Sequence, residues 1–198
     1  MTTLRKSHVR VRGNRVTLQF KAKHALRVRT TLIDDELADA IRELLQLPGG
    51  SRVFRYHWDD KIWNLTSKRL NDYVKIYMGE EFSAKDFRTW GGTLLTSVQL
   101  AEYAQRHGFP ETESAQKRSV TAVMRRVAEQ LGNTPAVTRA SYVSPAVVEQ
   151  YLDGRTIEDF RPQNLRIVTA RDIGLDQEEQ STLSLLRSWR VRETRKAA

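Results

Sequence analysis

The sequence predicts an α+β protein that is mainly α-helical, with a small three-stranded antiparallel meander at the N-terminus packed on a helical core. Three observations lead to this prediction. Residues 8–30 alternate polar and apolar side chains with the period of two that is typical of half-buried strands. Residues 114–131 repeat apolar side chains with the period of an α-helix. Capping residues and Gly/Pro breakers divide the intervening chain into further segments, most of them helical.

The meander is predicted from two turns. Gly13-Asn14 is a two-residue hairpin turn between the first two strands. A second turn follows at 21–24, and the third strand is expected over 25–30. The alternation gives the sheet one apolar face and one basic face. The apolar face is expected to hold Val9, Val11, Val16, Leu18, Phe20, Leu26 and Val28.

Start and stop signals predict the helices. They are expected at about 35–47, 66–78, 84–106, 114–131, 135–141, 145–153 and from 177 onward. Residues 54–64 are aromatic and are expected to be irregular. The helix after Ser83 is expected to bury a stripe of Phe87, Trp90, Leu94, Val98 and Ala101. We expect one domain over 1–175, made of the meander (1–33) and a helical core (34–175), followed by a C-terminal helix and basic tail over 176–198.

The net charge is concentrated in one segment. The 198 residues include 33 Lys and Arg against 24 Asp and Glu, a formal net charge of +9. Residues 1–33 hold nine basic and no acidic side chains, so they carry the whole excess. Such a block repels itself unless a polyanion covers it, and DNA or RNA is the expected partner. A flexible basic arm or a solvated sheet face remains the alternative.

Composition excludes several classes of protein. The absence of cysteine excludes a disulfide scaffold, a cysteine-ligated zinc site and a thiol nucleophile. No apolar run approaches the roughly 20 residues of a membrane span, and no secretory signal is evident, so a cytoplasmic protein is expected. We find no glycine-rich phosphate loop, and the histidines lack metal-ligand spacing. No metal and no cofactor are therefore expected.

Metal-free cleavage of a phosphodiester has specific chemical needs. Fixed cationic or amide donors must meet the non-bridging oxygens, and an acid must protonate the leaving oxygen. The nucleophile must be a side chain, and tyrosine suits a reversible reaction because its phosphate ester keeps the bond energy for religation. Two segments carry such residues: Lys-Asp-Phe-Arg-Thr-Trp-Gly over 85–91, and Leu-Gly-Asn-Thr-Pro-Ala-Val-Thr-Arg-Ala-Ser-Tyr over 131–142.

Both segments resemble the signature blocks of type IB DNA topoisomerases of the poxviral and bacterial branch. That family carries K-D-[FL]-R-T-[WY]-G around a phosphate-binding arginine. It also carries G-[HN]-T-P with the nucleophilic tyrosine nine residues after the His or Asn, the interval from Asn133 to Tyr142. Residues 3–9 match the family's T-L-x-x-x-H-[VI] strand. The resemblance covers nearly the whole chain in order and implies a fold of the type IB topoisomerase and tyrosine recombinase kind.

The resemblance implies a role for four residues. Tyr142 would form a 3′-phosphotyrosyl link, and Arg88 would donate bidentately to the scissile phosphate. Asn133 would donate a hydrogen bond to a non-bridging oxygen, and Lys23 would protonate the leaving 5′-oxygen. Lys21 lies on the same turn as Lys23, so the choice between them rests on the family register. Residues expected to bind DNA are Arg10, Arg12, Lys21, Arg27, Lys85 and Arg139.

Each of the four residues has a structural alternative. Tyr142 fits a core or interface tyrosine, and Arg88 fits a surface ion pair. Lys23 fits a solvated hairpin lysine, and Asn133 fits a residue that ends a helix for local reasons.

Two departures from the family pattern shape the expectations. Many members have His at the position of Asn133, and some bacterial members have Asn, so a bacterial-type protein is expected. The family has a further catalytic arginine upstream of the strand with which this chain begins. We therefore expect a chain that lacks this arginine and an N-terminal domain, binds double-stranded DNA and cleaves it slowly. Loss of one such donor typically costs about 10²–10³ in rate. A monomer associated with the nucleoid is expected.

Two rival functions remain open. A tyrosine recombinase or integrase shares this chemistry, but recombinases usually place His three residues before the arginine, where this chain has Lys85. A DNA-binding module that keeps the fold and has lost catalysis is the other alternative.

Overall fold

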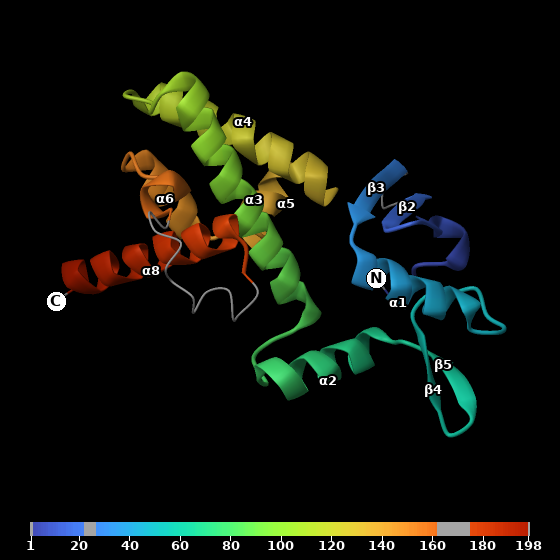
Figure 1. Ribbon diagram of the computed structural model, residues 1–198. Helices are drawn as coiled ribbons and strands as arrows, with labels where there is room; N and C mark the ends of the chain where they lie inside the picture. Colours follow the sequence, from blue (N-terminus) through green and yellow to red (C-terminus); the bar gives the residue numbers. More distant parts are fainter. Residues whose placement is uncertain (1, 22–26, 162–174, 198) are drawn as a thin grey trace. The chain divides into compact units, whose positions relative to one another are not determined.

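The computed structural model describes residues 2–21, 27–161 and 175–197, which form two compact units, Met1–Ala84 and Lys85–Ala198. Figure 1 shows the first unit as a small sheet with helices and a hairpin, and the second as a group of helices. We call them the N-terminal unit and the helical unit. The boundary between them lies inside the range that the sequence predicts as one helical core. None of the helices described is long and apolar enough to cross a membrane.

The N-terminal unit contains the predicted meander. After a 3₁₀ turn, η1 (Lys6–His8), three antiparallel strands follow in the order β1 (Val9–Arg12), β2 (Arg15–Lys21) and β3 (Arg27–Ile33). The third strand extends three residues beyond its predicted end, because residues 31–33 keep their pairing with 15–17. The second turn, with Lys23 and Leu26, lies outside the described residues.

One face of the sheet is apolar, as the alternation predicts. Val9 pairs with Leu18, and Val11 pairs with Val16, so these four side chains share one face. They pack against helix α1 (Asp35–Gln46), whose buried residues are Ala38 and Ile41. This small core fixes the register of β1 and β2, because a slip of one residue would turn the apolar side chains to solvent.

Two cations hold the carboxyl end of α1. The Lys6 ammonium donates to the carbonyls of Leu45 and Leu47, at 2.7 and 2.6 Å. The guanidinium of Arg55, only 6% exposed, donates to the carbonyls of Leu47 and Pro48 at 2.6 and 2.9 Å. Positive groups at this end complement the helix dipole and satisfy carbonyls that have no partner within the helix.

The prediction of an irregular segment over 54–64 is wrong. It forms a two-stranded antiparallel hairpin of β4 (Arg55–Trp58) and β5 (Lys61–Asn64). Asp59 and Asp60 make the turn with positive φ angles of 48° and 55°, a conformation that aspartate tolerates better than most residues. Helix α2 (Ser67–Met78) follows in the predicted range, and the Thr66 side chain caps its first turn.

The helical unit has one apolar core. Its elements are α3 (Ala84–His107), α4 (Glu113–Leu131), α5 (Pro135–Ser141), α6 (Pro145–Leu152), η3 (Ile157–Phe160) and α8 (Gln177–Ala197). The period predicted for 114–131 is confirmed, since Val120, Val123, Met124, Val127 and Ala128 are all buried, and Leu131 packs partly buried against the core. The core side chains of the unit include Leu100, Val123, Met124, Val127, Val147, Tyr151, Ile157 and Leu185.

The predicted stripe on α3 is partly wrong. Phe87 is 57% exposed, whereas the buried face is lined mainly by small residues around Gly92, Thr93 and Thr96. The Thr96 hydroxyl donates to the Gly92 carbonyl at 2.7 Å, so this buried polar group is satisfied within the helix. A face of small residues lets a neighbouring backbone approach a helix closely.

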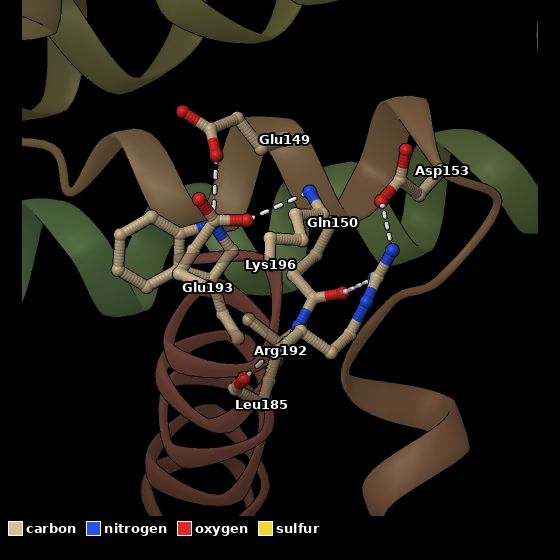
Figure 2. A network of polar contacts seen from close by, with 8 residues as sticks. Glu149, Gln150, Asp153, Leu185, Arg192, Glu193 and Lys196 are labelled. Atoms are coloured by element: carbon tan, nitrogen blue, oxygen red, sulfur yellow. Dashed lines mark hydrogen bonds and ion pairs between the residues drawn. The ribbon is translucent and has the colours of Figure 1, made fainter. Parts of the chain in front are cut away.

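Helix α8 is docked on α6 by a polar network (Figure 2). The Gln150 side chain, fully buried, donates to the Leu185 carbonyl at 3.2 Å and accepts from Arg192 at 3.1 Å. Arg192 also donates to Asp153 at 2.8 Å. A fourth link joins the Trp189 indole to Glu149 at 2.7 Å. The predicted C-terminal helix is therefore confirmed, and its first turns belong to the core of the helical unit.

Replacing the buried amide tests this docking. Gln150→Leu is expected to lower the free energy of unfolding by about 2 kcal/mol, because it removes the side-chain hydrogen bond to the Leu185 carbonyl and one of the partners of the Arg192 guanidinium. Gln130→Leu, an exposed position on α4, is the matched control and is expected to change it by less than about 0.5 kcal/mol. Denaturant unfolding measures both, and equal effects would contradict the role of the network.

Candidate functional site

The position of Tyr142 follows from two short helices. Thr134 caps α5, with Pro135 in its first turn, and α5 ends as the Tyr142 amide donates to the Thr138 carbonyl at 3.0 Å. Helix α6 begins three residues after Tyr142, at Pro145. Both helix starts are confirmed as predicted, and they leave only residues 142–144 as the connection. The tyrosine therefore lies at a tight junction, which we call the α5–α6 junction.

The Tyr142 ring is half-buried and faces two cations from the first turns of α3. The Arg88 guanidinium carbon lies 5.0 Å from the ring centroid, and the Lys85 ammonium lies 5.9 Å from it. Both distances fit cation–π contacts. Tyr151 differs, since it is 1% exposed in the core and burial raises the pKa of its phenol above 10.0. The geometry sets Tyr142 apart from a core tyrosine.

Arg88 also reaches the end of α4. Its guanidinium donates to the carbonyl of Leu131, the last residue of that helix. Gly132 then takes a left-handed φ of 66°. The backbone N–H of Asn133 donates to the Ala128 carbonyl at 2.9 Å and so closes the turn. Arg88 thus joins the turn before Asn133 to the ring of Tyr142, although the three residues are far apart in the sequence.

The side chain of Asn133 holds an unused hydrogen-bond donor. Within the described part of the chain, its amide nitrogen is buried and has no hydrogen-bond partner. An unpaired buried donor costs about 1–3 kcal/mol, so an acceptor that reached it would be favoured. A phosphate oxygen beside Arg88 would supply such an acceptor once the side chain turned toward it.

The outer face of the N-terminal sheet is cationic. The register puts six basic side chains on the face opposite the buried valines, and all six are exposed. Arg12 pairs directly with Arg15, and Lys21 pairs with Arg27, which are unfavourable neighbours unless an anion lies over them. We call this surface the basic face. Its members are Arg10, Arg12, Arg15, Lys21, Arg27 and Arg29.

Possible metal ligands were considered among the residues that the structure describes. Among the described residues, no group of three or more His, Asp or Glu side chains is arranged to hold an ion. The arrangement offers the Tyr142 phenol beside the Arg88 guanidinium, which also contacts the end of α4 two residues before Asn133, and an exposed arginine, Arg139, lies on helix α5. Such donors suit a phosphate group.

Comparison of the sequence with known proteins identifies a family. Residues 1–167 match the family model of the catalytic core of eukaryotic DNA topoisomerase I. The chain belongs to this topoisomerase family. It is also 33% identical, over 156 residues, to the DNA topoisomerase 1B of Acanthamoeba polyphaga mimivirus. That match covers 76% of this chain and 46% of the relative, so the chain spans about half the length of the curated relative it matches.

Family membership confirms the type IB topoisomerase resemblance and disfavours the recombinase alternative. The expectation of a bacterial-type protein stays a prediction, since the relative that matches is viral. The roles of the individual residues also stay predictions. Lys23 lies outside the described residues, and Lys21 is exposed at the end of β2.

Sequence analysis missed residues that link the helices around this candidate site. The Trp90 indole donates to Glu179 at 3.2 Å and so links α3 to the first turn of α8. The Ser144 amide donates to the Thr93 hydroxyl at 3.1 Å, which links the α5–α6 junction to α3. The available signal was the sequence Gly91-Gly92-Thr93, an unusual run of small residues inside a long helix.

Proposed function

We propose that this chain is the catalytic part of a type IB DNA topoisomerase. It would nick one strand of double-stranded DNA through Tyr142, allow the free end to rotate about the intact strand, and rejoin the nick without ATP, metal or cofactor. One observation carries the proposal: Arg88 contacts the ring of Tyr142 and, through the carbonyl of Leu131, the turn that presents Asn133.

Cleavage exchanges one phosphate ester for another. The phenol oxygen of Tyr142 attacks phosphorus, and its proton passes to water. The bond from phosphorus to the 5′-oxygen breaks, and the Lys23 ammonium gives that oxygen a proton. Arg88 and Asn133 stabilise the negative charge on the non-bridging oxygens. Religation is the reverse: the 5′-hydroxyl attacks the phosphotyrosine, Lys23 takes the proton back and Tyr142 leaves, so no external energy is needed.

The basic face supports double-stranded DNA as the substrate. Six exposed cations on one face of the sheet form an electrostatic footprint for a phosphate backbone. We propose that the chain acts as a monomer. DNA as the substrate supports a location with the nucleoid, in the cytoplasm if the protein is bacterial.

Replacing the nucleophile tests the proposal. With a nicked suicide duplex, the unaltered chain is expected to form a covalent adduct on a denaturing gel. Tyr142→Phe is expected to form none, because it lacks the attacking oxygen, while its DNA affinity stays within about threefold of the original. Tyr151→Phe, in the core of the same unit, is the control and is expected to keep the adduct.

Three outcomes would contradict the assignment. An adduct that persists in Tyr142→Phe would move the nucleophile elsewhere. Normal DNA affinity of the unaltered chain without any adduct at long times would instead favour a DNA-binding module. Strand exchange between two specific sites would favour a recombinase.

The general acid is tested with a substrate that does not need one. Lys23→Ala is expected to slow cleavage of an ordinary 5′-oxygen substrate by about 10²–10⁴, the usual contribution of a general acid. A bridging 5′-sulfur leaves without protonation, so its cleavage is expected to change little. Lys21→Ala is the control, expected to weaken binding of both substrates alike. An equal loss on both substrates in Lys23→Ala would remove the proposed role.

The basic face is tested by salt. DNA affinity is expected to fall steeply between low and moderate salt, since each neutralised phosphate adds about 0.9 to the slope of log affinity against log salt. Arg10→Gln and Arg27→Gln are each expected to lower that slope by about 1. Lys117→Gln, which removes an ion pair with Glu113 on α4, is the control. A flat salt dependence would show that the basic face does not contact DNA.

A further inference from the structure

Gly92 gives the α5–α6 junction room to approach α3. A β-carbon built on Gly92 would lie 3.1 Å from the Tyr142 β-carbon and 3.2 Å from its carbonyl carbon, and it would overlap the Tyr142 carbonyl oxygen. That oxygen is well inside 3.0 Å, closer than a β-carbon approaches another atom. Gly92 lies inside a regular helix and is buried. A glycine there destabilises the helix relative to alanine. Its structural role at this position is to leave room for the backbone of Tyr142.

The neighbouring glycine shows that this approach is local. A β-carbon on Gly91 would meet no described atom within 4 Å. The two glycines are adjacent in one helix, yet only Gly92 faces the backbone of Tyr142. Alanine at the two positions therefore adds the same methyl group to the same helix with opposite steric consequences.

Thr93 supplies a second, independent contact with the junction. Its hydroxyl accepts a hydrogen bond from the Ser144 amide at 3.1 Å, and its side chain is 3% exposed. The Tyr142 amide is bound from the other side, by the Thr138 carbonyl at 3.0 Å. The backbone around the tyrosine is thus held on α5 before it and on α3 after it.

The same face of α3 carries the phosphate-binding arginine. Arg88 and Gly92 are four residues apart, so they lie one above the other on the helix. The contact at Gly92 fixes the tyrosine backbone one turn away from the guanidinium, which lies 5.0 Å from the phenol ring. The backbone contact at Gly92 therefore helps to fix how far the Tyr142 ring lies from the Arg88 guanidinium.

We propose that Gly92 and Thr93 are positioning residues for DNA cleavage, which hold Tyr142 against α3 so that its phenol is aligned with the phosphate bound by Arg88. The inference rests on the proposed function and adds residues that touch neither DNA nor the reacting atoms. It predicts a defect in the attack on phosphorus and none in DNA binding.

Alanine at the two glycines tests the steric part. Gly92→Ala is expected to slow single-turnover adduct formation by about 10²-fold, because a displacement near 1 Å has that effect on a reacting group. Its DNA affinity should stay within about threefold of the original, and circular dichroism should show a folded chain at the assay temperature. Gly91→Ala is the matched control and is expected to keep the rate of adduct formation within about threefold.

The bridging 5′-sulfur substrate separates positioning from acid catalysis. In Gly92→Ala the slow step is the attack by the phenol, so a better leaving group is expected to restore little of the rate. A full rescue by sulfur would overturn the proposal, because it would place the defect at the leaving oxygen.

Thr93 provides a test that does not depend on the folding of Gly92→Ala. Thr93→Val keeps the shape of the side chain but removes the acceptor for the Ser144 amide, and it is expected to slow adduct formation by about 10-fold, the effect of one hydrogen bond. Thr93→Ser keeps the acceptor and is expected to restore the rate. Rates equal to the original in both Gly92→Ala and Thr93→Val would overturn the positioning role while leaving the proposed function intact. Failure of the unaltered chain to form an adduct on Tyr142 would overturn both.

Discussion

The close approach of one backbone segment to one helix face determines the candidate site. Residues 142–144 pack on α3 because Gly92 has no side chain and Thr93 offers a hydrogen-bond acceptor. That contact leaves the Tyr142 ring beside Arg88, which is anchored in turn on the carbonyl that ends α4. The steric fit at Gly92 and the hydrogen bond from Ser144 to Thr93 thus join the α5–α6 junction to α3, and the hydrogen bond from Arg88 to the Leu131 carbonyl joins α3 to α4. Every chemical role proposed for this chain requires that these groups stay together.

Local signals allowed much of the fold to be predicted. The turn at Gly13-Asn14, the cap at Thr134 and the helix start at Ser144-Pro145 act within a few residues, so their effects on strands and helices are visible in the sequence. The apolar period of α4 was equally local. The hairpin of β4 and β5 was missed because an Asp-Asp turn lacks the glycine that usually marks such turns.

The site was predictable only as a set of residues. The spacing from Asn133 to Tyr142 and the segment around Arg88 identified the family, but spacing along the chain does not give contacts across it. The buried face of α3 was mispredicted for the same reason: apolarity was taken to mark burial, whereas the helix buries small residues where another backbone comes close. Burial of that kind depends on which segment packs against the helix, and the pattern of residues within the helix carries no information about that segment. The position of charge was more predictable, since strand alternation alone places the six cations of the basic face on one side of the sheet.

The measurement that tests this account most directly identifies the protein residue, and the phosphate position on the nucleotide, that the covalent bond to DNA joins. The covalent product of a nicked duplex is digested with nuclease and trypsin, and the nucleotide-bearing peptide is fragmented in a mass spectrometer. The account predicts a nucleotide joined through its 3′-phosphate to Tyr142 in the peptide of residues 140–155, with Tyr151 in the same peptide unmodified. A nucleotide on any other residue, or one joined through a 5′-phosphate, would contradict it.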